Sequence, residues 1–438
     1  MDRKQSFRSW ERPKTSLALF QAVVIPSSGA SAPMEQNQLF ALALGLTEPW
    51  YVASLDFSAE DKRLEIGIDF RRGGVFPCPE CGATGCKAYD TEQREWRHLN
   101  FFEHQTVLRA RVPRIDCTQC GVRPVNVPWS RAGSGFTLLF EAFVLALAAH
   151  MPVRAIARLV GEHDTRLWRT IHHYVDTARG QRDDAGVRNV GIDDKSVRRG
   201  HDYVTVFADL DERKVLFVAD GRKGEVLEQF RWDLIEHGGD PKRIAEICVD
   251  MSAAYIAGVE NSFPRAAITF DKFHVMKLLS EAIEKTRREE QKGTPELKGH
   301  RFALLKNPEN MRDDELEFAS ALLSRRSTMK TAKAFHLRLS FQDFYAQPAR
   351  AAKRFLHRWC SWASRSRVPE MVRVARTLRK HAAGVLRWFT SRITNGLLEA
   401  INSLIQSAKA RARGFRTTAN LKAIIYLIAG KLDLQSTH

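Results

Sequence analysis

No apolar run in this 438-residue chain approaches the roughly 20 residues that a helix needs to cross a bilayer, so no membrane partner is expected. Internal repeats and low-complexity blocks are also missing, which excludes solenoid and repeat-array architectures. The apolar fraction of 44% is ordinary for a globular protein. At this length the chain has room for two to four domains, each with its own core.

Acidic residues are scarce relative to basic ones. Lys and Arg number 68 against 51 Asp and Glu, so the net charge is +17, and the pI is about 9.7. Such an excess indicates a polyanionic partner, either nucleic acid or an anionic membrane surface. Because no segment is suited to a membrane, nucleic acid is the better interpretation.

The seven cysteines are odd in number and scattered, which argues against a disulfide framework and favours a reducing compartment. Four of them form two CxxCG turns, at Cys78/Cys81 and at Cys117/Cys120. Each turn points two thiolates inward, and 35 residues between the pairs leave room for a β-hairpin. The pattern predicts a zinc ribbon with one structural Zn²⁺. Cys86 could compete as a ligand, and four unligated core cysteines are the alternative.

The first 33 residues have the outline of a secretory signal, with a basic start, an apolar run over residues 17–25 and an Ala-Ser-Ala site. Gln21 interrupts the apolar run, so we reject that interpretation. We expect residues 1–37 to be an N-terminal extension, disordered or arising from a mis-assigned start upstream of Met34.

Residues 152–160 and 165–175 carry helical periodicity on either side of a turn at residues 161–164. This spacing fits a helix-turn-helix, whose second helix reads the DNA major groove. Arg166, Arg169 and His173 would be its exposed DNA-contacting residues. A plain helical hairpin in a core is the alternative.

Three acids are candidates for phosphoryl-transfer chemistry. Asp193 and Asp250 each end a short apolar run typical of a strand. Two neighbouring buried carboxylates repel each other unless a cation lies between them, and oxygen-only ligands favour Mg²⁺ or Mn²⁺. The third acid, Glu399, lies on an amphipathic helix expected over residues 395–412. We place it on the polar face with Asn402, and that face continues through Lys409 and Arg413 as a basic track along DNA.

Several linked motifs resemble DDE transposases of the ISL-three group of bacterial insertion sequences. The stretches that carry this resemblance are Gly191-Ile192-Asp193-Asp194, Val249-Asp250-Met251-Ser252, Phe270-Asp271-Lys272-Phe273-His274-Val275, Thr394-Asn395-Gly396 through Glu399 and Asn402, and Arg413-Gly414-Phe415. Four positions depart from the usual pattern: Asp194, Thr394, Ala400 and Gln406.

The resemblance implies a ribonuclease-H-like catalytic fold interrupted by a helical insertion before the glutamate. It also implies a catalytic triad of Asp193, Asp250 and Glu399 that holds two Mg²⁺ or Mn²⁺ ions. Asp271 and His274 would lie near the active site as accessory groups, although both could simply cap the helix that follows.

The sequence therefore predicts a multidomain α/β protein. We expect the N-terminal extension at residues 1–37, the zinc ribbon at 38–130, the helix-turn-helix at 131–185, and the catalytic domain at 186–434 with its helical insertion at about 280–390.

The expected function is a transposase that binds terminal inverted repeats and catalyses metal-dependent DNA cleavage and strand transfer. It would act on double-stranded DNA as a homo-oligomer in the bacterial cytoplasm, associated with the nucleoid. One alternative is a DNA-binding regulator with an inactive catalytic domain. Another is a recombinase with a covalent nucleophile, for which Tyr426 is a nominal candidate in apolar surroundings.

Overall fold

The computed structural model describes residues 35–197, 203–325 and 328–434. Backbone packing divides the chain into two compact units. The first comprises the chain up to Arg179, together with Ala408–Phe415 and the residues from Leu432 on; the second comprises Gly180–Ser407 and Arg416–Lys431. The expected N-terminal extension falls almost entirely on residues 1–34, outside the described part of the chain.

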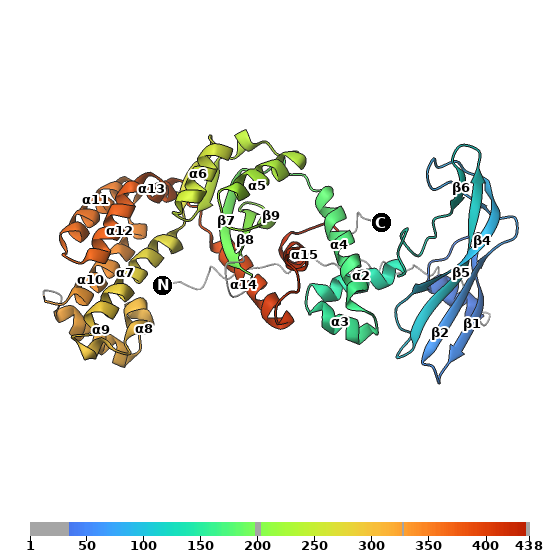
Figure 1. The fold of residues 1–438 in the computed structure, drawn as a ribbon, viewed down its shortest axis with the longest axis horizontal. Coiled ribbons are helices and arrows are strands. Elements are labelled where there is room, and N and C mark those ends of the chain that lie inside the picture. Colours follow the sequence, from blue (N-terminus) through green and yellow to red (C-terminus); the bar gives the residue numbers. More distant parts are fainter. Residues whose placement is uncertain (1–34, 198–202, 326–327, 435–438) are drawn as a thin grey trace, which may run out of the picture. The chain divides into compact units, whose positions relative to one another are not determined.

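The first unit begins with a short helix and a sheet (Figure 1). Its strands follow the order β1-β2-β5-β4-β3, and β6 pairs with β5. Alternate residues of β2 are buried, as expected for a strand with one face on a core. Helix α1 was not anticipated from the sequence. The elements are α1 (Gln36–Ala43), β1 (Trp50–Ser58), β2 (Arg63–Phe70), β3 (Val75–Phe76), β4 (Cys86–Arg97), β5 (Gln105–Cys117) and β6 (Gly121–Pro124).

Three helices follow in the same unit: α2 (Leu138–Ala148), α3 (Val153–Val160) and α4 (Asp164–Gly180). Helix α3 ends at Gly161, whose φ of 70° suits a residue without a side chain. The fully buried Glu141 of α2 holds the group together, because it forms an ion pair with Arg131 at 3.0 Å and accepts a hydrogen bond from Tyr174 of α4 at 2.9 Å. The two helices predicted for the helix-turn-helix are therefore present, and the second is longer than expected.

The second unit is built on a five-stranded mixed sheet with the order β11-β10-β7-β8-β9. Strand β8 is antiparallel to β7 and β9, whereas β10 and β11 run parallel to β7. This is the topology expected of a ribonuclease-H-like sheet. The strands are β7 (Asn189–Ser196), β8 (Tyr203–Asp209), β9 (Lys214–Asp220), β10 (Glu246–Val249) and β11 (Ala267–Phe270).

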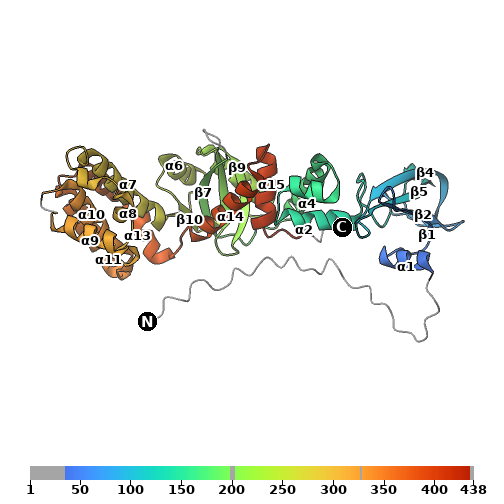
Figure 2. The ribbon, with the colours of Figure 1, turned by 90° about the horizontal axis from the view of Figure 1, so that it is seen from below.

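Helices cover both faces of this sheet (Figures 1 and 2). On one face lie α5 (Glu225–Glu236) and α6 (Ala253–Ser262), and on the other lies α14 (Gly396–Ala412). Gly191 of β7 permits the close approach of α14, because a Cβ atom there would lie 2.8 Å from Leu398 Cδ1 and 3.0 Å from Asn395 Oδ1. A larger residue would push α14 away from the sheet.

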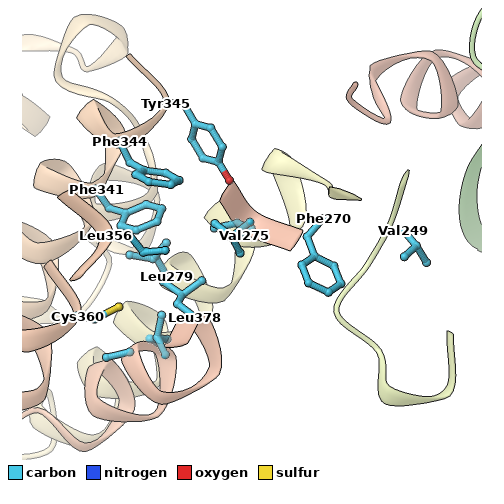
Figure 3. Packing of buried hydrophobic residues seen from close by; sticks show 14 of the residues in the cluster. Val249, Phe270, Val275, Leu279, Phe341, Phe344, Tyr345, Leu356, Cys360 and Leu378 are labelled. Atoms are coloured by element: carbon cyan, nitrogen blue, oxygen red, sulfur yellow. The ribbon is translucent and has the colours of Figure 1, made fainter. Parts of the chain in front are cut away.

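The described chain between β11 and α14 contains helices and short 3₁₀ turns but no strand. Its apolar core is continuous with that of the sheet, and Figure 3 shows Phe270 and Val249 of the sheet with Leu279, Phe341 and Leu356 of the helices. The helices are α7 (Lys272–Glu290), α8 (Arg301–Leu305), α9 (Asp313–Ser324), α10 (Lys330–Gln342), α11 (Ala349–Arg365), α12 (Pro369–Lys380) and α13 (Ala382–Ser391).

The last helix, α15 (Thr418–Ala429), packs beside β9. Its Tyr426 is 3% exposed, and the hydroxyl accepts a hydrogen bond from the Val218 N–H at 2.9 Å. A hydroxyl buried in this way cannot serve as the accessible nucleophile of a covalent recombinase. Among the helices that the structure describes, we find none with the length and hydropathy to span a bilayer.

Candidate active site

The central acids lie where parallel strands of the sheet stop pairing. Asp250 directly follows β10, as predicted, whereas Asp193 lies inside β7, which continues beside β8 as far as Ser196. The expectation that Asp193 ends a strand is therefore wrong, because β8 extends the ladder on one side. On the other side, pairing with β10 ends at Gly191 opposite Cys248. Asp193 and Asp250 each lie two residues beyond that pair, level with one another.

Asp271 lies level with Asp250, because it follows Phe270, which pairs with Val249. Three aspartates on neighbouring parallel strands thus share one level of the sheet. The Asp271 side chain is 2% exposed and accepts hydrogen bonds from His274 Nδ1 at 3.1 Å and the Asn395 N–H at 3.2 Å. Asp271 occupies the N-cap position of α7, but its side chain makes no capping hydrogen bond. Its contacts are instead directed toward α14 and His274.

Glu399 projects from the first turn of α14 into a cleft of about 590 Å³. Asp193, Asp271 and His274 also line this cleft, whereas Asp250 does not. Among the described residues, the carboxylates of Asp193, Asp250 and Glu399 do not all lie within 4.8 Å of one another. The three acids therefore do not form one close carboxylate cluster in this structure.

Two buried asparagines, one directly before α14 and one on it, complete the arrangement, and their contacts were not predicted from the sequence. Asn402, expected on the polar face of this helix with Glu399, is 6% exposed and donates to Asp193 Oδ2 at 2.6 Å. Asn395 donates to the Ile192 carbonyl at 3.1 Å. Within the described chain, the Oδ1 atoms of both asparagines are buried without a hydrogen-bond partner. Their seven-residue spacing, which places both on one helix face, was the available signal.

The electrostatics of the cleft show an excess of negative charge. Burial raises the pKa of Asp193, against the opposing effects of His274 and of the hydrogen bond from Asn402. Burial and the charges of Asp271 and Asp193 raise the pKa of Glu399. Burial lowers the pKa of His274, but the hydrogen bond and charge of Asp271 outweigh it and leave the pKa raised. A cation in the cleft would relieve this repulsion.

Asp194 also borders the cleft, but its side chain points to the opposite face of β7. Its carboxylate accepts hydrogen bonds from Tyr255 of α6 and, at 3.1 Å, from Thr205. Burial raises its pKa to about 6 despite these hydrogen bonds. The alternation of side chains along a strand thus separates Asp193, on the α14 face, from Asp194, on the α6 face.

The four paired cysteines of the first unit form a separate cluster. The sulfurs of Cys78, Cys81, Cys117 and Cys120 all lie within 4.8 Å of one another, with 3.6 Å between Cys81 and Cys117. A tetrahedral site with Zn–S bonds of about 2.3 Å would separate its sulfurs by about 3.8 Å, so the cluster fits zinc. Backbone N–H groups of Gln119 and Cys120 lower the pKa of Cys117 to about 7. Cys86 lies outside the cluster.

A second group with metal-ligating side chains, Asp184, Asp233 and His237, does not need an ion. The Arg182 guanidinium lies 2.6 Å from Asp184 and 2.7 Å from Asp233. Because this buried cation already balances the two carboxylates, we assign the group a structural role.

The predicted DNA-contacting residues all lie in the first unit, in or just beyond its helices. Arg166 is engaged within the protein, because it lies 2.5 Å from Glu162 and 4.3 Å over the Phe136 ring. Arg169 and Arg413 are exposed, whereas His173 and Lys409 are partly buried. Arg169 is thus the most accessible candidate on α4.

Comparisons with known proteins agree with this architecture. A family model described as a transposase matches residues 190–425. Residues 125–175 match the helix-turn-helix domain of transposase family ISL3, and residues 74–120 match the zinc finger of the transposases of IS204, IS1001, IS1096 and IS1165.

Two curated relatives are transposases. The chain is 28% identical to the transposase for insertion sequence element IS1557 of Mycobacterium tuberculosis, over 90% of this chain and 96% of that protein. It is also 28% identical to the transposase for IS1001 of Bordetella parapertussis, over 78% of this chain and 86% of that protein.

The chain therefore belongs to transposase family ISL3, with an N-terminal zinc ribbon, a helix-turn-helix and a mixed α/β catalytic domain. The alternative of a regulator without transposase function is not favoured.

Proposed function

We propose that this transposase binds the terminal inverted repeats of its insertion sequence, cleaves the DNA at those ends and joins them to target DNA, using Asp193, Asp250 and Glu399. The observation that carries the proposal is the strand register, which sets Asp193 and Asp250 level on neighbouring strands, with Glu399 facing Asp193 across the cleft.

The residues present fit two Mg²⁺ or Mn²⁺ ions. All candidate ligands are oxygens, which these ions prefer. The Asn402 side chain, whose Nδ2 donates to Asp193, also has a buried Oδ1 atom without a hydrogen-bond partner in the described chain. When bound, such ions would activate the attacking oxygen and stabilise the leaving oxygen.

The chain's own groups hold these acids and the DNA. Asn402 donates to one oxygen of Asp193, and the Asp194 N–H donates to the other at 2.9 Å, so both oxygens are held in place. His274, held by Asp271, provides positive charge for a phosphate oxygen. In cleavage, a water oxygen bonds to phosphorus and the bond to the 3′ oxygen breaks. In strand transfer, the freed 3′ oxygen bonds to a target phosphorus and the bond from that phosphorus to the target strand's own 3′ oxygen breaks, with no covalent bond between protein and DNA.

Recognition of the ends would rest on α4, with Arg169 as the leading base contact and with Arg166 and His173 beside it. Lys409 and Arg413 would contact the phosphate backbone. Because an insertion sequence has two ends, we infer a homo-oligomer assembled on DNA in the bacterial cytoplasm.

For the zinc ribbon, we propose one structural Zn²⁺ bound by Cys78, Cys81, Cys117 and Cys120. Metal analysis of the purified protein should find one zinc per chain. The Cys117→Ser/Cys120→Ser variant should lose it together with the folding of this region, because structural zinc contributes folding free energy. Retention of zinc in that variant would contradict the assignment.

The test of the catalytic proposal is a plasmid that carries the element's ends, incubated with the full-length protein. We expect ends with a free 3′-OH and strand-transfer products with Mg²⁺ or Mn²⁺, and neither product with chelator. Cleavage in chelator, or a trapped covalent adduct between protein and DNA, would refute the mechanism.

A further inference from the structure

The positive charge of this protein is concentrated in one short stretch. Residues 344–398 contain twelve Lys and Arg and a single acid, Glu370, so they carry +11 of the net +17. Residues 35–179, which include the zinc ribbon and the helix-turn-helix, contain 17 basic and 17 acidic residues and are neutral. Most of the excess that indicates nucleic acid therefore lies outside the region expected to read DNA.

Helix α11 presents much of this charge on one face. Its exposed basic residues recur at three- and four-residue spacings over 15 residues, about 22 Å of helix. The opposite face is buried in the core through Leu356, Trp359 and Cys360. The exposed side chains are Arg350, Lys353, Arg354, His357, Arg358 and Arg365.

Helix α12 extends the same surface. Its Arg379 donates to Ser361 of α11 at 3.4 Å, so the exposed sides of the two helices adjoin. We call the exposed basic residues of the two helices the basic face; α12 contributes Arg373, Arg376, Arg379 and Lys380.

The charges of the basic face are mostly unpaired. Within the described residues, only Arg373 among them has an ion-pair partner, Glu370. A surface that only keeps a protein in solution normally interleaves both signs, because clustered like charges repel one another. The arginines of the zinc ribbon show the contrast, since Arg109, Arg111 and Arg114 each pair with a carboxylate. The basic face therefore lacks its counter-charge within the described chain.

We propose that the basic face binds the target DNA duplex through its phosphates, a role that rests on the strand transfer proposed above. Phosphate contacts carry no sequence information, so they suit DNA that must be accepted whatever its sequence. The terminal repeats, by contrast, have a candidate base reader in α4. The face also belongs to the same compact unit as the catalytic cleft.

The first measurement is binding of the full-length protein to a random-sequence duplex at several salt concentrations. The Lys353→Gln/Arg354→Gln/Arg358→Gln variant should reduce the slope of log K against log salt by about 2–3, since each lost phosphate contact removes about 0.9. The matched control is Lys285→Gln/Lys292→Gln/Lys298→Gln, which removes the same charge from exposed lysines on α7 and the loop that follows it. An unchanged slope, or an equal fall in the control, would overturn the proposal.

The second measurement separates target DNA from element ends. With DNA ends that are already cleaved and bound, the Lys353→Gln/Arg354→Gln/Arg358→Gln variant should need at least about tenfold more target plasmid for half-maximal strand transfer. In a separate assay on uncleaved ends, the same variant should cleave the ends at the wild-type rate. Loss of end cleavage with an unchanged target requirement would assign the face to the ends and overturn the proposal. If the wild-type protein failed to cleave at all, the catalytic proposal would fail, whereas the salt slope would still test the face.

Discussion

The two units of this transposase use charge in opposite ways. In the zinc ribbon, cross-strand pairs such as Arg111 with Asp69 and Arg114 with Asp90 balance the charges internally. In the second unit, acids gather around the cleft and bases gather on α11 and α12. Charges that are paired within the chain stabilise the fold a little, whereas segregated charges are available to a metal ion or to DNA. Net charge alone predicts the partner but not where it binds.

The strongest test of this contrast concerns the three acids proposed to be catalytic. Asp193→Asn, Asp250→Asn and Glu399→Gln should each reduce end cleavage at least about 10³-fold, roughly 4 kcal/mol, because an amide keeps the shape but loses the charge that holds a divalent ion. Binding to the terminal repeat should stay nearly intact. Cleavage assays on plasmid ends, with binding measured in parallel, provide the readout.

The matched control is Asp194→Asn, one residue away on the other face of β7. It should retain most of the cleavage activity, because Asp194 contacts Tyr255 and Thr205 instead of the α14 face. If Asp194→Asn abolished cleavage while Asp193→Asn did not, the first aspartate of the triad would be misassigned.

The ion pair between Glu141 and Arg131 in the first unit should affect the stability of the fold and not DNA cleavage. Glu141→Gln leaves the Arg131 charge without its partner, which should cost about 2–3 kcal/mol of unfolding free energy, less than a fully buried pair because Arg131 is 24% exposed. Urea unfolding measures this loss. Glu92→Gln, in an exposed pair with Arg94, should change stability by less than about 1 kcal/mol. Equal losses of unfolding free energy in Glu141→Gln and Glu92→Gln would contradict the distinction between the buried and the exposed pair.

Asn402 should act as a positioning residue through Asp193. Asn402→Ala removes a hydrogen bond to a carboxylate, worth about 1.5–3 kcal/mol, so cleavage should fall roughly 10- to 100-fold. The Mg²⁺ concentration for half-maximal activity should rise, which a purely structural defect would not cause. Ser407→Ala, exposed on the same helix, is the control. An unchanged metal requirement in Asn402→Ala would refute the role.

The smallest expected effects compare one paired and one unpaired arginine. Arg111→Ala should cost less than about 1 kcal/mol of stability, because its ion pair is exposed, and should leave DNA binding unchanged. Arg354→Ala should leave stability unchanged and lower the salt slope of DNA binding by about 0.9. Thermal unfolding and DNA-binding titrations of the two variants provide the readout. An effect of Arg111→Ala on DNA binding as large as that of Arg354→Ala would contradict the contrast.

Features that depend on local pattern were predictable from the sequence. The CxxCG turns predicted the cysteine cluster, and helical periodicity predicted α3 and α4. Short apolar runs predicted that Asp193 and Asp250 lie on neighbouring strands. Each of these signals spans a few residues whose geometry is set by their own backbone.

Features that depend on distant contacts were not predictable. The helical wheel placed Asn402 on the polar face with Glu399, but it did not show that Asn402 is buried and donates to Asp193, 209 residues away in the sequence. Arg166 was expected to contact DNA, but its guanidinium lies over the ring of Phe136, 30 residues away in the sequence. A wheel gives the two sides of a helix, whereas the width of the buried side depends on the surface against which the helix packs.

The order of elements along the chain also determines which parts of the protein are synthesised first. The helix-turn-helix is complete at Gly180, but Glu399 is added 219 residues later, and only then can α14 cover the sheet beside Gly191. Nascent chains grow at about 5–20 residues per second and fold from the N-terminus first, so the delay is roughly 10–40 s. During that interval the nascent chain has its helix-turn-helix and lacks Glu399, so each copy would acquire the proposed means to hold DNA before the proposed means to cut it.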